Sequence, residues 1–342
     1  MNYIFTALVP FLLLICVLWG SHKTESKDIF MNKDYTQVLK GICSIIVILV
    51  HIPLEYSNKL QDGIGSFAYV CVTFFFLISA YGMSLNEEKN DTYLKDFWKN
   101  RLSSLLIPCL LVNAGIWGIS QMFVDTTLGN IFVINDYVLV LLQYCLWFYI
   151  ISLGKRYYGN KTANALLIVG VTVSSLLLYF FVHSDVSAQS GWCFERMGLV
   201  WGVLLFLYFP RAQQFFSFSI DKVCIFSFLC LLLGILYLIY KPVFFWGEYL
   251  LKILLGGIII FWVFIISSQR VYGNKAIFFL GSISYEIYLS HGGMMCFLSN
   301  ICPKLSSGVF ILLTVIGTIF FSIIIHALDT PIVKFCRKIH LP

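Results

Sequence analysis

The sequence predicts an all-α fold, a polytopic bundle of about 10–11 membrane-spanning helices. Two observations concern composition: hydrophobic residues make up 59% of the 342 residues, and charged residues only 12%. That charged fraction is about half of the fraction in a soluble domain. The third observation is that apolar residues gather in runs of about 20, the length of a helix that crosses a bilayer. These runs lack the period-2 alternation of a transmembrane β-barrel.

Eleven such runs follow one another, with boundaries placed to within several residues. The first run has no cationic segment before it and no small-residue cleavage site, so we expect a retained helix and not a signal peptide. The predicted spans are residues 3–20, 38–54, 65–85, 103–123, 137–153, 163–183, 193–209, 222–240, 249–267, 276–299 and 307–327.

The positive charges alternate between the ends of successive spans. Of the 23 Lys and Arg residues, 18 follow odd-numbered spans and 5 follow even-numbered spans. Positive residues collect on the cytoplasmic side of a membrane protein. We therefore expect the N-terminus outside and the C-terminus in the cytoplasm. This topology accounts for the net charge of +6, and no nucleic-acid partner is predicted.

The eleven cysteines form no C-x-x-C pair and no cluster with histidine. Most of them lie inside predicted spans, where a cysteine behaves as a small apolar residue. The sequence therefore predicts no metal site, no disulfide framework and no permanently bound cofactor.

The second span places a histidine at membrane depth. It contains KGICSIIVILVH, from Lys40 to His51. With the orientation above, Lys40 lies at the cytoplasmic end and His51 about 16 Å further out, because a helix rises about 1.5 Å per residue. The two side chains share one face of the helix, being about three turns apart. Ionisable groups at this depth usually mark a pathway or a site, so His51 is the leading candidate. Lys40 fits a snorkelling residue equally well.

Spans 3, 4 and 5 carry polar and aromatic residues that favour packing or anchoring. Ser79 and Tyr81 lie in FFFLISAYGMS, where small and hydroxylic residues favour close helix contacts. Lys99 and Arg101 open span 4 at the cytoplasmic surface, either as topology determinants or as a cationic seat for a phosphate-bearing ligand. Trp147 in CLWFYI belongs either to helix packing or to a pocket wall.

Span 10 is the most polar. Its segment GSISYEIYLSHGG holds Ser284, Tyr285, Glu286 and His291. Taken as one helix from residue 276, the span brings His291 about 22 Å from its inner end, a depth comparable to that of His51. Two histidines at one depth on separate helices predict a shared polar chamber, where Glu286 requires a partner. Near the cytoplasmic end of span 11, His326 and Asp329 are expected in ordinary interfacial roles.

These motifs together resemble acyltransferase family 3, the integral-membrane O-acyltransferases of bacterial surface glycans. The resemblance runs from about residue 32 to 338. The family core has ten helices, so residues 1–30 are expected to form an extra transmembrane helix and linker, and residues 31–342 the membrane acyltransferase domain. The segments that resemble the family motifs are, in order, KGICSIIVILVH, FFFLISAYGMS, FWKNRLSSLLIP, LWFYI, LGSISYEIYLSH and LDTPIVKF.

Three residues depart from the family pattern. Lys40 replaces the usual arginine, which keeps the charge but loses the planar fork. Ser104 stands where many members carry a second arginine, and Asp329 stands where glutamate is usual. None of these changes affects His51.

The resemblance implies transfer of an acyl group, most often acetyl, from cytosolic acyl-CoA to a hydroxyl of a cell-surface carbohydrate or glycolipid, in the bacterial inner membrane. His51 is the expected general base and His291 the second catalytic residue. Acyl-CoA, a glycan or lipid-linked saccharide acceptor and membrane lipids are the expected partners. The donor is expected on Lys40, Lys99 and Arg101, and the pocket wall at Ser79, Tyr81, Trp147, Ser284, Tyr285 and Glu286.

A second class of function stays open. His51, Glu286 and His291 also fit the relay of a proton-coupled secondary transporter or exporter. Such transporters often contain an inverted repeat, and the sequence shows no convincing one. Hydrolysis or transfer of the acyl group of labelled acetyl-CoA would favour the enzyme, and inert CoA the transporter.

Overall fold

The computed structural model describes residues 2–123, 130–182 and 192–338. These residues are mostly helical, and in this part of the chain the only sheet is the antiparallel pair β1 (His22–Lys23) and β2 (Arg270–Val271). The helices are α1 (Asn2–Leu18), α2 (Lys33–Val50), α3 (Lys59–Gly65), α4 (Tyr69–Lys89), α5 (Phe97–Phe123), α6 (Asp136–Val182), α7 (Met197–Leu207), α8 (Phe209–Phe215), α9 (Ile220–Tyr240), α10 (Lys252–Ser267), α11 (Lys275–Ser282), α12 (Ser284–Ile301) and α13 (Ser307–Lys338), with short turns at Lys27–Ile29 (η1), Leu54–Tyr56 (η2) and Trp246–Leu251 (η3).

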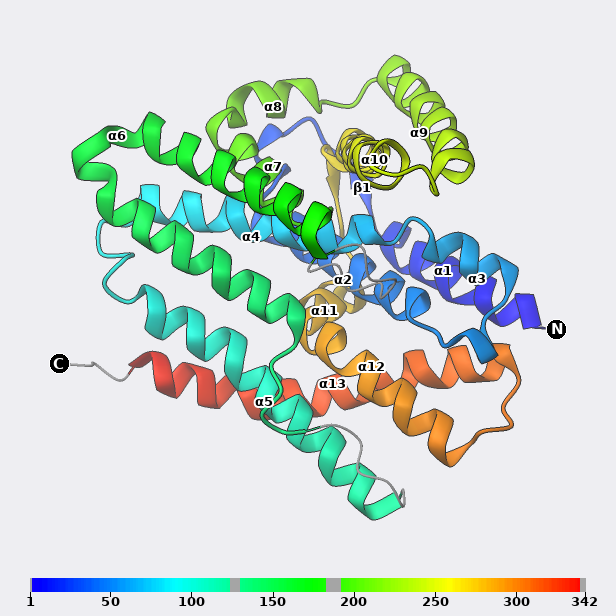
Figure 1. Ribbon diagram of the computed structural model, residues 1–342. Helices are drawn as coiled ribbons and strands as arrows, with labels where there is room; N and C mark the ends of the chain where they lie inside the picture. Colours follow the sequence, from blue (N-terminus) through cyan, green and yellow to red (C-terminus); the bar gives the residue numbers. More distant parts are fainter. Residues whose placement is uncertain (1, 124–129, 183–191, 339–342) are drawn as a thin grey trace.

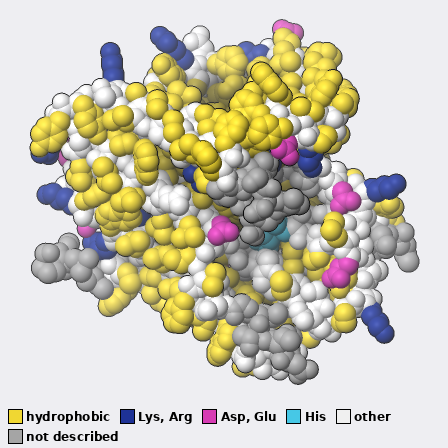
Figure 2. All heavy atoms as spheres, viewed as in Figure 1, with side chains coloured by type: hydrophobic (Ala, Val, Ile, Leu, Met, Phe, Trp, Pro, Cys, Tyr) yellow, Lys and Arg dark blue, Asp and Glu magenta, His cyan; other side chains and the backbone are white. Residues whose placement is uncertain are grey.

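The predicted polytopic helical bundle is confirmed, since each predicted span is mostly helical in the described residues; residue 183, the end of the span 163–183, lies outside them. Six helical stretches in the described ranges are long and apolar enough to cross a membrane. Helices α1 and α7 are apolar but shorter than a full span, and α2 and α12 carry more polar residues. Large apolar side chains lie exposed on many helices, and Figure 2 shows them over much of the upper and left parts of one face. Such a surface fits contact with lipid.

Helix α6 contains two of the predicted spans. It folds back on itself near its middle, as Figure 1 shows. The break falls at Gly159, whose φ of 79° and ψ of 163° lie outside the helical region. An L-residue with a side chain rarely adopts a positive φ, so glycine is the natural residue at this turn.

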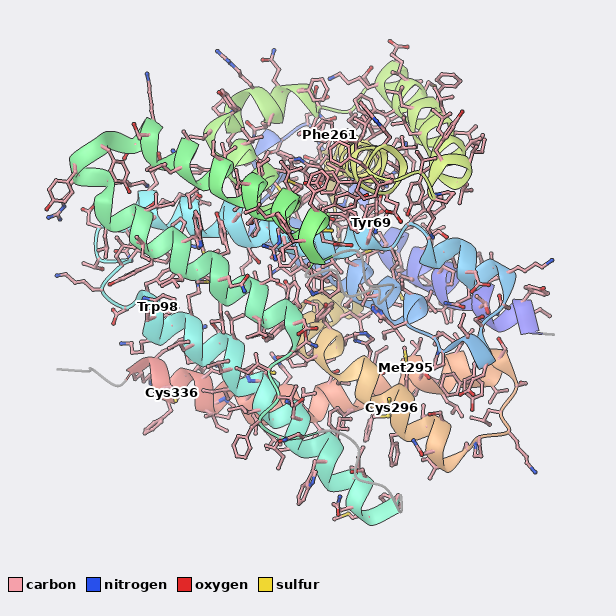
Figure 3. The ribbon with its side chains drawn as sticks, viewed as in Figure 1. Tyr69, Trp98, Phe261, Met295, Cys296 and Cys336 are labelled. Atoms are coloured by element: carbon pink, nitrogen blue, oxygen red, sulfur yellow. The ribbon has the colours of Figure 1, made fainter. Side chains whose placement is uncertain are left out.

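The expectation of one continuous helix over residues 276–299 is wrong. The segment is divided at Ile283 into α11 and α12. The helical rise counted from residue 276 therefore does not set the depth of His291 or Glu286. Helix α12 instead obtains its position by packing against α2, α5 and α13. Its Met295 is buried in the core and its Cys296 is exposed, so the helix has an inner and an outer face (Figure 3).

Glycines bring α11 into direct backbone contact with α2. A Cβ on Gly41 would lie 2.9 Å from the amide nitrogen of Gly281, and a Cβ on Gly281 would overlap the carbonyl oxygen of Gln37. The side-chain amide of Gln37 also donates a hydrogen bond to the carbonyl of Phe278 at 2.8 Å. Small residues at such a crossing let two membrane helices approach closely.

The Gly281→Ala variant is expected to be destabilised, by about 1–3 kcal/mol, because the added methyl group forces the two backbones apart. Its melting temperature in detergent should fall. Gly118→Ala is the matched control, since a Cβ there meets no atom within 4 Å outside its own helix. Equal melting temperatures for the Gly281→Ala variant and the wild type would contradict the packing argument.

Candidate active site

Two histidine rings meet where α2 and α12 converge. His51 is the C-terminal capping residue of α2, and its backbone N–H donates to the carbonyl of Ile48 at 3.2 Å. His291 lies in α12, and the centroids of the two rings are 4.8 Å apart. The His51 side chain is exposed, whereas the His291 residue is only 7% exposed. One histidine can therefore be reached from outside the bundle while the other lies behind it; Figure 2 shows a histidine side chain near the centre of the face.

The backbone orients both imidazoles in the same way. Nδ1 of His51 lies 2.9 Å from the carbonyl oxygen of Val47, and Nδ1 of His291 lies 2.5 Å from that of Tyr288. A carbonyl oxygen only accepts hydrogen bonds, so each Nδ1 carries the proton and donates it. In the neutral rings Nε2 is then left with its lone pair. The pair thus presents two imidazoles in the tautomer that accepts a proton at Nε2.

A cavity of about 400 Å³ extends to Tyr288, which contacts His291, although neither histidine lines it. Helices α2, α4, α5, α6, α11 and α12 all contribute to its wall. The cations Lys40 and Arg101 line it, and no carboxylate lies within ion-pairing distance of either in the described ranges. Arg101 instead donates to the hydroxyl of Tyr93 at 2.7 Å. The polar residues that line the cavity are Lys40, Ser79, Asn86, Arg101, Ser104, Tyr137, Ser282, Ser284, Tyr285 and Tyr288.

Two buried tyrosines connect the cavity with the histidines. Tyr137 and Tyr288 both line the cavity, and their ring centroids are 4.6 Å apart. The ring of Tyr288 is in turn 5.6 Å from that of His291. An elongated ligand with an anionic group at the two cations can therefore extend towards the histidine pair. Tyr137 was not among the candidates from the sequence, since nothing in its local pattern marks it.

The structure brings several predicted site residues together and leaves others apart. Ser79, Ser284 and Tyr285 line the cavity together with Lys40 and Arg101, and Ser104 lies beside Arg101. Four other predicted residues contact different groups.

Tyr81 packs against Phe209 with ring centroids 5.7 Å apart, because it lies two residues from Ser79 and faces away from the cavity. Lys99 pairs with Asp96 at 2.7 Å. Trp147 covers Gly170 beside a separate cavity of about 90 Å³.

Glu286 faces α13. Its Oε1 lies 2.8 Å from Nδ1 of His326, and Asp329 belongs to the same cluster. Asp329 is only 3% exposed, so an ordinary interfacial role does not describe it. Because Glu286 contacts His326 and Asp329 and not His51 or His291, the structure provides no continuous relay through the three residues.

The arrangement suits transfer of a group between a buried ligand and an accessible one. The cavity offers cations, hydroxyls and aromatic rings, and the imidazole pair lies behind Tyr288, one of its lining residues. Imidazole is the commonest general base at neutral pH. A hydrogen bond from Nδ1 to a main-chain carbonyl orients each ring.

The family comparison agrees with this geometry. The family model for the acyltransferase domain of acyltransferase family 3 matches residues 33–327, from the start of α2 to α13. This range contains both histidines and the whole cavity lining. Neither the curated proteins nor the solved structures compared with the chain include a significant match. The match covers most of the described chain, and the protein is therefore a member of acyltransferase family 3.

Proposed function

We propose that the protein is a multi-pass O-acyltransferase of the bacterial inner membrane that moves an acyl group, acetyl in the simplest case, from cytosolic acyl-CoA to a hydroxyl of a cell-surface carbohydrate or glycolipid. The observation that carries the proposal is the histidine pair, with Nε2 available on both rings, together with a cavity that reaches Tyr288 next to His291 and is lined by two cations without carboxylate partners in the described ranges. Membership of the family supports acyl transfer in general.

The donor is proposed to occupy the cavity. Phosphate groups of CoA would bind Lys40 and Arg101, since cations form strong charge-assisted hydrogen bonds with phosphate. The thioester would then lie near Tyr137 and Tyr288, which line the cavity near the histidines. Lys40 and Arg101 lie in the N-terminal halves of α2 and α5, and the charge distribution assigns the N-terminal ends of both helices to the cytoplasm, where acyl-CoA is available.

The acceptor is proposed to reach His51, the exposed member of the pair. Its hydroxyl would give its proton to Nε2 of His51 as the oxygen attacks the thioester carbonyl. The carbon–sulfur bond then breaks, the CoA thiolate takes the proton from His51, and the products are an ester and free CoA. His291, buried against His51, would hold the base in position.

Purified protein incubated with labelled acetyl-CoA is expected to release CoA and, with a suitable sugar acceptor, to form a labelled ester. In cells, surface glycans are expected to lose ester groups when the protein is absent. The two measurements together test the proposal: intact acetyl-CoA in every condition and unchanged surface esters would contradict it. Esters that disappear without CoA turnover in vitro would instead point to export of an already acylated compound.

A further inference from the structure

Three side chains from α12 and α13 form a compact cluster outside the cavity. Glu286 lies in the first turn of α12, and His326 and Asp329 lie three residues apart on α13, so both project from one face. Nδ1 of His326 is 2.8 Å from Oε1 of Glu286 and 3.8 Å from Oδ1 of Asp329. One nitrogen and two carboxylate oxygens thus lie within 4.8 Å of one another.

The charges in this cluster are not balanced by the described residues. Glu286 is 5% exposed and Asp329 3%, and neither forms an ion pair with a lysine or arginine in the part of the chain that the structure describes. Oε2 of Glu286 and Oδ2 of Asp329 are buried and have no hydrogen-bond partner there. With both carboxylates ionised, a protonated His326 would neutralise only one of them. Buried charge is costly unless it is paired or bound to a metal.

We propose that Glu286, His326 and Asp329 bind a divalent transition-metal ion, with Zn²⁺ as the best fit. Zinc accepts imidazole and carboxylate ligands at about 2.0–2.2 Å, which places tetrahedral ligand atoms roughly 3.4 Å apart. The observed separations, from 2.8 Å to within 4.8 Å, bracket this value. Three protein ligands leave a fourth position for water.

The surroundings of His326 fit metal binding through Nδ1. When Nδ1 binds a metal, the ring proton is on Nε2, and Oγ1 of Thr330 lies 3.4 Å from that nitrogen as an acceptor. Thr330 also lies 3.3 Å from Oδ1 of Asp329, so it contacts two of the three ligands. Hydrogen bonds of this kind to the second ring nitrogen orient metal-bound histidines. The His326 side chain is 34% exposed, which gives an ion access to the site.

The bound ion would join α12 to α13. Glu286 is two residues from Tyr288 and five from His291, so the link would stabilise the helix that bears both. Tyr285 faces the cavity while Glu286 faces α13, so the ion would not contact a ligand in the cavity. The proposal concerns stability and metal content, and it stands independently of the proposed function.

Metal analysis of the intact chain tests the proposal. Protein purified in detergent, stripped with chelator and dialysed against micromolar Zn²⁺, is expected to retain about one ion per chain and to melt at a higher temperature than the stripped form. Glu286→Gln and Asp329→Asn each remove one charged ligand while keeping the shape, and are expected to weaken Zn²⁺ binding at least about tenfold. Glu55→Gln, at an exposed glutamate, is the matched control and should bind as the wild type does.

Two results would overturn the inference. One is a wild-type protein that neither retains Zn²⁺ nor changes its melting temperature in a titration with Zn²⁺. The other is Glu286→Gln or Asp329→Asn protein that retains the ion as tightly as the wild type. If the variants fail to fold, the wild-type titration decides alone. A rise in stability of the variants without any metal binding would assign the cluster to a shared proton instead.

Discussion

Replacing His51 by alanine is expected to lower kcat about 10²–10⁴-fold, the range for loss of a general base. The residue offers Nε2 as the only exposed proton acceptor of the histidine pair, because its Nδ1 donates to Val47. The amount of inserted protein and its melting temperature should change little, since the side chain is exposed at the end of α2. The measurement is formation of labelled ester from labelled acetyl-CoA by equal amounts of purified protein.

His22→Ala is the matched control for this variant. His22 is exposed in β1 and pairs with Val271 of β2 through the backbone. The His22→Ala variant should retain the full activity of the wild type. A correctly inserted His51→Ala protein that acylates as fast as the wild type would remove the central claim of the mechanism.

The Lys40→Ala/Arg101→Ala double variant is expected to raise KM for acyl-CoA about tenfold to a hundredfold for each cation removed, with a smaller effect on kcat. A hydrogen bond to a charged group contributes about 1.5–3 kcal/mol, and about 1.4 kcal/mol is tenfold in affinity. Both cations line the cavity without a carboxylate partner in the described ranges, so they are available to a phosphate. Initial rates over a range of acetyl-CoA concentrations give both constants.

The Lys99→Ala variant tests whether a change in KM comes from loss of a donor-binding cation or from loss of any positive charge nearby. Lys99 lies two residues before Arg101 but pairs with Asp96 outside the cavity, so its removal should leave KM nearly unchanged. The Lys40→Arg variant should keep or increase the affinity for acyl-CoA, because the planar guanidinium of arginine binds phosphate with two hydrogen bonds. Equal KM values for the double variant and the wild type, or a Lys40→Ala protein altered only in topology, would refute the donor role.

The helical membrane fold could be predicted because its cause is local. A segment that crosses the hydrocarbon core must be apolar over its whole length and must satisfy its backbone hydrogen bonds internally. Each membrane helix can therefore be recognised as a continuous run of apolar residues. Each of the eleven predicted spans is mostly helical in the described residues for this reason. The break at Ile283 is not local in this sense. It accompanies the backbone contact between Gly281 and α2, which belongs to a segment 240 residues away in the chain.

Part of the candidate site could also be predicted. His51 is conspicuous because an ionisable side chain closes an apolar run, and His291 because it ends the most polar segment. Similar depth predicts a shared polar chamber for the two residues, although the depth of His291 depends on a continuous helix that the structure does not contain. Packing of α12 against α2 brings the rings together instead.

The sequence by itself determined the membrane-helical fold, the family, and the helices on which the candidate histidines and cations lie, since these depend on residue type and spacing along one helix. Only the tertiary structure decided which of these side chains share a space. It placed Arg101 in the cavity and Lys99 outside it, added Tyr137, and joined Glu286 to His326 across 40 residues. Such contacts depend on how the faces of different helices are turned towards one another, and that is set by packing among all the helices at once.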